Sequence, residues 1–152
     1  MILISHRGNI NGKSNRENQP EYIQEALVQD FDVEVDIWYT DGEFWLGHDR
    51  PQYQIKESFL ENSRLWCHSK NIEGLNKMLK NNLIHCFWHQ NDTLTLTSKN
   101  IVWTVPKYNF NEEIIPNSVA VLPEYGYNGN IRKCYGICSD VIQKLGPTLP
   151  IL

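Results

Sequence analysis

Two carboxylates, Glu34 and Asp36, lie inside a segment whose other residues are mostly apolar. Over residues 32–39, valine and isoleucine occupy the alternate positions, and this period of two predicts a strand with both carboxylates on one face. Unpaired carboxylates on an interior face repel each other and lose hydration. A divalent cation relieves both effects, and oxygen ligands of this kind suit Mg²⁺ or Ca²⁺. The segment therefore predicts a metal site.

Ionisable side chains also stand where apolar runs end along the rest of the chain. They are His6 and Arg7, His48 and Asp49, His68 and Lys70, His89, Glu124 and Asp140. The carboxyl ends of parallel strands in a barrel share one rim, so we expect these side chains to converge there. Histidine would then supply proton transfer at neutral pH. His85 precedes an apolar run instead, and we expect it at the opposite face, which serves stability.

The elements that must position these residues alternate between strands and short helices. Strands are predicted at 2–5, 32–39 and 43–47, and in the apolar runs that begin at residues 65, 84, 101, 119 and 134; helices are predicted at 21–29, 72–82 and 141–145. Asp41-Gly42 is a typical two-residue hairpin turn. The alternation predicts an α/β fold with a parallel sheet.

We expect this sheet to close as a compact, reduced TIM (β/α) barrel with short helices and an extra β-hairpin after the second strand. Full barrels of this kind need about 250 residues, so several helices must be shortened or replaced by loops. An open doubly wound sheet is the alternative, but it calls for a glycine-rich first turn, and residues 8–12 are a poor match. Residues 1–152 show no composition shift, which predicts a single domain.

Composition excludes several classes of function. The 152 residues are 41% hydrophobic and carry 14 basic and 18 acidic side chains, for a net charge of -4. This balance gives no electrostatic footprint for nucleic acid, and no apolar run is long enough for a membrane span. The chain shows no secretion signal, and its four cysteines lie in apolar stretches. We therefore expect a cytoplasmic protein with buried thiols.

In their order along the chain, several short motifs resemble those of the glycerophosphodiester phosphodiesterase family. They are His6-Arg7-Gly8, Glu17-Asn18, Glu34-x-Asp36, Asp41-Gly42, Gly47-His48-Asp49 and Lys70, with a looser match at 101–105 and 135–140. The family belongs with the phosphatidylinositol phospholipases C, has a TIM barrel fold and cleaves phosphodiesters with a metal ion. The resemblance thus implies a metal-dependent hydrolase acting on a small phosphodiester.

The resemblance also implies roles for individual residues. Glu34 and Asp36 would bind the metal, His6 and His48 would form the acid/base pair, and Arg7 and Lys70 would hold the substrate phosphate. The remaining rim residues have roles that follow from their positions. Glu17 would reach the rim from the first loop or interact with the N-terminus of the following helix, and Asp49 would orient His48 or cap the turn beyond it. His89 and Glu124 match no ligand of the family and would contact substrate or face solvent.

Two departures from the family pattern qualify these roles. His68 stands where the family has its third metal ligand, a glutamate, and one imidazole among carboxylates shifts preference toward Mn²⁺ or Zn²⁺ and away from Ca²⁺. The expected ion is Mg²⁺ or Ca²⁺, with Mn²⁺ or Zn²⁺ as the alternative because of His68. The family's roofing insertion after the His48 motif is short here, so glycerol need not be the alcohol. A lyase that forms a cyclic phosphate and a non-catalytic phosphate-ester-binding domain are the alternatives, and oligomeric state is open.

Overall fold

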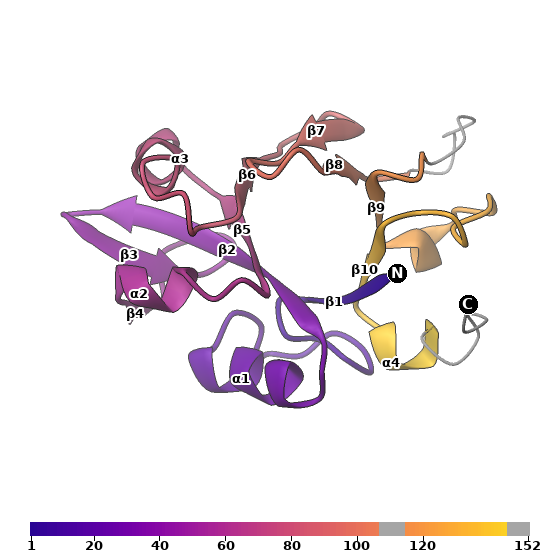
Figure 1. Cartoon of the computed structure of the whole chain (residues 1–152). Helices are drawn as coiled ribbons and strands as arrows, with labels where there is room; N and C mark the ends of the chain where they lie inside the picture. The colour runs from indigo at the N-terminus through magenta and orange to yellow at the C-terminus, as the bar shows by residue number, and fades with distance from the viewer. Residues whose placement is uncertain (107–114, 146–152) are drawn as a thin grey trace.

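A computed structural model describes residues 1–106 and 115–145 of the chain, in which ten strands form one curled mixed sheet (Figure 1). The strands are β1 (Ile2–His6), β2 (Asp32–Thr40), β3 (Glu43–Leu46), β4 (Tyr53–Ile55), β5 (Leu65–Ser69), β6 (Cys86–Trp88), β7 (Leu94–Leu96), β8 (Val102–Thr104), β9 (Ser118–Val121) and β10 (Gly136–Ser139). The helices are α1 (Pro20–Val28), α2 (Glu57–Leu60), α3 (Ile72–Met78) and α4 (Ile142–Leu145), with a 3₁₀ helix, η1, at Pro123–Tyr125.

Parallel strands make up the body of the sheet. Their order is β6-β5-β2-β1-β10-β9-β8. The remaining strands are antiparallel additions, with β3 and β4 extending from β2 as a meander and β7 pairing with β8. Asp41 and Gly42, the turn between β2 and β3, have φ of 53° and 82°, the backbone that an Asp-Gly hairpin turn requires.

The expectation of a TIM barrel is wrong: the curled sheet is a half-barrel with few helices. Within the described residues no strand ladder joins β6 to β7, so the sheet does not close. The connection from β6 to β8 contains the antiparallel strand β7 instead of a helix, and the one from β9 to β10 contains only η1. Neither connection contains the helix that alternates with strands in such a barrel. In the connection from β9 to β10, Gly126 and Gly129 also disfavour a helix.

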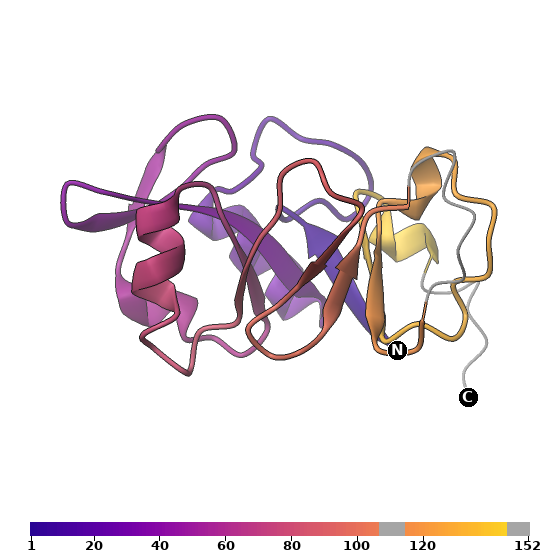
Figure 2. The same cartoon turned by 90° about the horizontal axis from the view of Figure 1, so that it is seen from above.

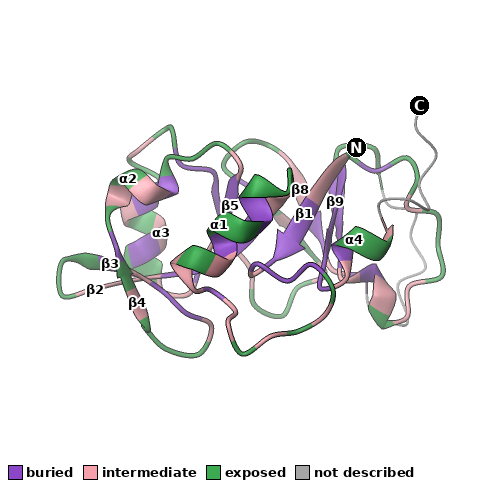
Figure 3. Ribbon diagram, turned by 90° about the horizontal axis from the view of Figure 1, so that it is seen from below, coloured by how far each residue is buried: buried purple, intermediate pink, exposed green. Residues whose placement is uncertain are grey.

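Helices cover the outer surface of the sheet at a few places only. Figure 2 shows α3 beside the hairpin at one flank and α4 near η1 at the other, while α1 packs on β2. The apolar face of α1, which consists of Ile23, Ala26 and Leu27, is buried, and the opposite face of this helix is exposed (Figure 3). None of the described helices has the length and apolar character needed to cross a bilayer.

Successive side chains on each strand point to opposite faces of the sheet, and this divides the apolar interior into two clusters. The larger one contains Val33, Val35 and Ile37 of β2 and lies beneath α1 and α3. The smaller one lies on the other face of the strands and consists of Ile4, Trp66, Phe87, Trp103, Val119, Val121 and Cys138. Side chains two residues apart on a strand share a face, so His6 and His68 extend the same face as Ile4 and Trp66. The smaller cluster therefore forms the floor beneath these histidines.

All four cysteines are buried free thiols, as expected from the sequence. Burial raises the pKa of Cys67 and of Cys138 well above the usual thiol value. Thiols held in the neutral form are poor nucleophiles and poor metal ligands, so they act as small core residues.

Candidate active site

Two neighbouring parallel strands, β2 and β5, bring the predicted metal ligands together, and β1 places His6 beside them. Sheet register pairs His6 of β1 with Glu34 of β2, and Asp36 of β2 with His68 of β5. One ligand atom from each of Glu34, Asp36 and His68 lies within 4.8 Å of the others. This group could hold a metal ion, as the alternation of carboxylates in the sequence predicted.

Asp36 is fully buried and surrounded by positive groups. Its carboxylate lies 2.8 Å from Arg7 Nε, 3.4 Å from Lys70 Nζ and 3.2 Å from His68 Nδ1. Burial opposes its ionisation, but the hydrogen bond from His68 and the charges of Arg7 and Lys70 outweigh burial and hold the pKa of Asp36 well below its usual value. Asp36 is therefore an ionised carboxylate throughout the physiological range.

Asn18 fixes the orientation of Asp36. Its Nδ2 donates to Asp36 Oδ2 at 2.9 Å, and its Oδ1 accepts the Asp36 backbone N–H at 3.0 Å. Asn18 has a φ of 62°, a left-handed conformation that asparagine tolerates better than most residues. The asparagine thus suits both the backbone at this position and the side-chain bridge.

His68 is held with one ring nitrogen toward the carboxylates. Its Nε2 lies 2.7 Å from the His89 carbonyl oxygen, which only accepts hydrogen bonds, so Nε2 is the donor. Nδ1 then faces Glu34 at 3.5 Å and Asp36 at 3.2 Å. Burial lowers the pKa of His68, but the bonds to both carboxylates outweigh burial and raise it to about 9. A carbonyl partner on the far nitrogen is the usual support of a metal-binding histidine.

Glu34 supplies one of several buried polar atoms that have no hydrogen-bond partner among the described residues, and Asp36 Oδ1 in the same site is another. The Glu34 side chain is only 2% exposed, and its Oε2 is the unpartnered atom; the nearest cationic candidate, His6 Nε2, is 3.7 Å away. A buried carboxylate oxygen without a partner is costly. The donor set of two carboxylates and an imidazole, with this orphaned oxygen, fits a divalent ion.

A third buried carboxylate, Asp140, orients His6. Asp140, which follows β10, accepts from His6 Nδ1 at 2.7 Å and from Asn9 Nδ2 at 2.8 Å, and Tyr125 Oη donates to its other oxygen at 2.8 Å. Burial raises its pKa, but the bonds from His6, Asn9 and Tyr125 outweigh burial and lower it to about 2. The protonated Nδ1 of His6 therefore points at Asp140, and Nε2 faces Glu34 in the pocket.

The loop after β1 turns sharply to aim the Arg7 side chain at Asp36. Arg7 has a φ of 56° and Gly8 a φ of 92°. A Cβ on Gly8 would lie 2.6 Å from the Tyr22 ring, so glycine allows α1 to approach. Glu17 accepts from Arg7 Nη1 at 3.2 Å and from Asn9 at 2.8 Å. Of its two predicted roles, Glu17 thus supports the site from the loop.

His48 lines the same pocket from the end of β3. Gly47 precedes it at a φ of 148°, and the Gly47 carbonyl accepts from Trp38 Nε1 at 2.7 Å. The His48 side chain is 42% exposed, and its Nδ1 lies 2.6 Å from Asp49 Oδ1. Asp49 itself is almost fully exposed, so its contact within the site is with His48.

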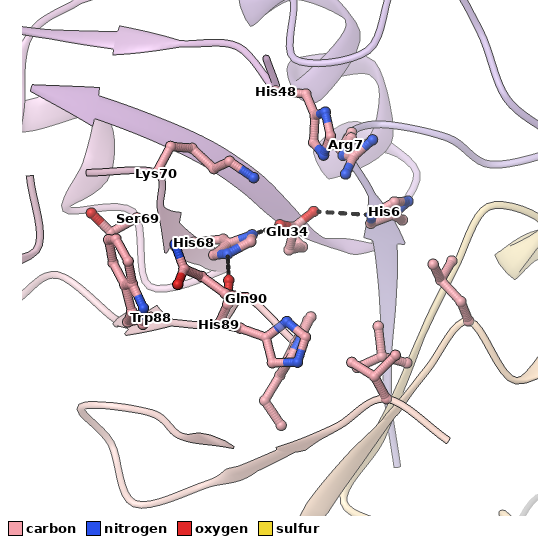
Figure 4. A pocket seen from close by; sticks show the side chains of 14 residues that line it. His6, Arg7, Glu34, His48, His68, Ser69, Lys70, Trp88, His89 and Gln90 are labelled. Atoms are coloured by element: carbon pink, nitrogen blue, oxygen red, sulfur yellow. Dashed lines mark hydrogen bonds and ion pairs between the residues drawn. The ribbon is translucent and has the colours of Figure 1, made fainter. Parts of the chain in front are cut away.

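These side chains surround one pocket of about 280 Å³ (Figure 4). It is lined by His6, Arg7, Glu34, His48, His68, Ser69, Lys70, Trp88, His89, Gln90, Trp103, Val105, Val121 and Leu122. Most ionisable groups come from β1, β2 and β5, or follow them directly. The apolar residues Trp103, Val105, Val121 and Leu122 belong to β8 and β9 or follow them directly, whereas Trp88, His89 and Gln90 lie at the end of β6 and just after it. The pocket therefore has a charged side and an apolar side.

The predicted site residues are mostly gathered here. Glu17 and Asp49 do not line the pocket but contact lining residues, Arg7 and His48. Glu124 does not line it either: its Oε1 accepts from Ser139 Oγ and the Asp140 backbone N–H. Asp36 is buried just behind the lining. Sequence reasoning did not assign roles to Asn9, Asn18 or Tyr125. Asn18 lay within a quoted motif, whereas Tyr125 carried no signal because its partner is distant in the chain.

The comparisons with known proteins give no further assignment. Neither family models, nor curated proteins, nor solved structures match this chain. Its function must therefore be argued from the geometry above.

Proposed function

We propose that the protein is a metal-dependent phosphodiesterase acting on a small phosphodiester. The observation that carries the proposal is the group of Glu34, Asp36 and His68, buried beside two histidines and two cations in one pocket. Proton transfer needs titrating groups, and an anionic phosphate needs positive charge. The motif resemblance described above leads to the same activity.

The charged side of the pocket would receive the phosphate. Arg7 offers a planar fork of donors for two phosphate oxygens, whereas Lys70 acts as a point charge. Both now contact Asp36, so phosphate oxygens would share these cations with a carboxylate already in place. The ion held by Glu34, Asp36 and His68 would act as a Lewis acid toward the phosphoryl oxygen.

The two histidines would carry out proton transfer. His6 is suited to be the base, because Asp140 keeps its Nδ1 protonated and leaves Nε2 toward the pocket. Asp140 would also stabilise the imidazolium that forms. His48, on the more exposed side, would protonate the leaving oxygen, and each transfer is typically worth about 10²–10⁴-fold in rate.

The donor set also bears on the metal. Two carboxylates alone suit Mg²⁺ or Ca²⁺, but an imidazole ligand favours Mn²⁺ or Zn²⁺ relative to Ca²⁺. We therefore propose Mn²⁺ or Zn²⁺ as better activators than Ca²⁺, with Mg²⁺ between them.

A non-catalytic phosphate-ester-binding domain is the second candidate. The observation that favours it is the triple contact of Asp36 with Arg7, Lys70 and His68, which balances its charge without an ion. The His6–Asp140 pair argues for catalysis, since binding alone does not require an oriented base. A cyclising lyase would use the same residues with a substrate hydroxyl as the nucleophile.

A metal screen with a chromogenic diester tests the proposal. Purified protein is stripped with chelator, then assayed on bis-p-nitrophenyl phosphate with Mg²⁺, Ca²⁺, Mn²⁺ or Zn²⁺. We expect turnover that requires the ion and is lost in His6→Asn and in Glu34→Gln. Arg16→Gln is the matched control, because Arg16 pairs with Glu25 on the surface away from the pocket. If the protein binds phosphate esters but shows no turnover with any of these ions, the result would contradict the phosphodiesterase and support the non-catalytic phosphate-ester-binding domain.

Product analysis separates the hydrolase from the lyase. The substrate here must carry a hydroxyl beside the ester, as a glycerophosphodiester does. Phosphorus NMR of the products then shows a monoester for hydrolysis and a cyclic phosphate for the lyase.

A further inference from the structure

The apolar side of the pocket has no role in the proposed chemistry. Trp103 lies within β8 and Val105 follows that strand, while Val121 ends β9 and Leu122 follows it. Metal binding, phosphate binding and proton transfer all use the charged side. The apolar side is therefore available to a different part of the substrate.

Leu122 shows that this wall is apolar even where the backbone favours another residue. Its φ is 50°, a left-handed conformation that glycine and asparagine adopt more readily than leucine. Its side chain is nevertheless a pocket-lining apolar group. Non-glycine residues in such conformations cluster at functional sites, which agrees with a role for this side chain in contacting substrate.

The size of the pocket limits what the apolar side can hold. A dry cavity of about 150 Å³ is enough to bind benzene in another protein. The pocket here is about 280 Å³ in total, so a phosphate group on the charged side leaves space for one ring-sized group. Ligand pockets typically combine an apolar lining with a few polar groups that fix orientation, as these two sides do.

We propose that the preferred substrate carries a compact apolar ester group, about the size of a six-membered ring, against Trp103, Val121 and Leu122. This inference rests on the proposed function, because it takes the charged side as the phosphate site. It assigns the alcohol that the short connection after His48 leaves open: an aryl or similarly compact apolar alcohol rather than glycerol.

Calorimetric titration of the metal-loaded protein tests the inference without any turnover. The probes are inorganic phosphate, glycerol 3-phosphate and phenyl phosphate. Burying a ring against apolar side chains should make phenyl phosphate bind about tenfold or more tightly than glycerol 3-phosphate. Leu122→Asn suits the left-handed backbone, so this variant should fold, and it makes the wall polar. It should remove most of the preference while changing the affinity for inorganic phosphate by less than about twofold.

Leu83→Asn is the matched control, because Leu83 is 59% exposed and does not line the pocket. It should keep the full preference for phenyl phosphate. If phosphate binds but phenyl phosphate binds no more tightly than glycerol 3-phosphate, or Leu122→Asn keeps the preference, the inference is overturned and the proposed function stands. If none of the three probes binds, the proposed function fails, and the inference fails with it.

Discussion

Acid should destabilise this protein through His85, a histidine outside the pocket. Its ring is buried, lies 4.2 Å from the Trp66 ring and has its Nε2 2.8 Å from Thr97 Oγ1. Burial, with a smaller effect of the Lys99 charge, lowers the pKa of His85 from 6.5 to about 4. The folded state thus favours the neutral imidazole, whereas the unfolded chain takes up a proton below pH 6.5.

The size of the effect follows from the two pKa values. A difference of about 2.5 pKa units at 1.36 kcal/mol per unit corresponds to at most about 3 kcal/mol of unfolding free energy. Because the folded pKa is depressed, this stability is fully present above the unfolded value of 6.5 and is lost as pH falls toward 4. About 2 kcal/mol should be lost by pH 5 and nearly all of it by pH 4.

Urea unfolding at pH 7, 6, 5 and 4 provides the assay, with tryptophan fluorescence as the signal. His85→Gln keeps a hydrogen-bonding amide near Thr97 but cannot titrate, so its unfolding free energy should fall less with acid than that of the wild type. The comparison removes the contribution of carboxylates, which titrate in both proteins. Equal losses in the two proteins between pH 7 and pH 4 would refute the assignment of a buried neutral His85.

Three further outcomes follow from the site and its loops. Saturating Mn²⁺ should raise the melting temperature of the wild type, since an ion at 100 times its Kd adds about 2.7 kcal/mol, and Asp36→Asn should lose most of this gain. Asp140→Asn should lower kcat on a phosphodiester by about 10²-fold or more with a small change in KM, because His6 loses its orienting carboxylate. Gly47→Ala should destabilise the fold by more than about 2 kcal/mol, because its Cβ would lie 2.1 Å from a backbone carbonyl oxygen at a φ of 148°. Gly42→Ala, strained but with open space around the Cβ, should cost about 1 kcal/mol.

Each of these outcomes has a result that contradicts it. Equal Mn²⁺ stabilisation of wild type and Asp36→Asn in differential scanning calorimetry would place the ion elsewhere. Steady-state kinetics in which Asp140→Asn retains the wild-type kcat would remove the orienting role of Asp140. Chemical unfolding in which the Gly47 and Gly42 variants lose the same free energy would show that the Gly47 contact is relieved by a small backbone shift.

Local patterns in the sequence were sufficient for the elements around the metal group. The alternation of valine and isoleucine with Glu34 and Asp36 predicted β2 and the shared face of the two carboxylates. The apolar spacing over residues 21–29 predicted α1, and Asp41-Gly42 predicted the hairpin. These signals are local, because side-chain period and turn backbone depend on residues within one element.

The closed barrel was predicted wrongly because strand spacing alone does not determine how the connections pack. No element was predicted between the apolar runs that begin at residues 84 and 101, and this connection folds back as β7. A segment of this length can pair with the exposed edge of β8 or pack as a helix, and local propensity does not decide between the two. The expected helix over 72–82 ends as α3 at Met78.

The amino-acid sequence by itself determined which residue types face the pocket from β1, β2 and β5, since strand parity is a property of the chain. Only the tertiary structure decided which of them touch. His6 meets Asp140 across 134 residues, and His68 is held by the His89 carbonyl. Such contacts depend on the order of strands in the sheet, which brings β10 beside β1 and β6 beside β5. That order results from the packing of the whole interior, and no short segment encodes it.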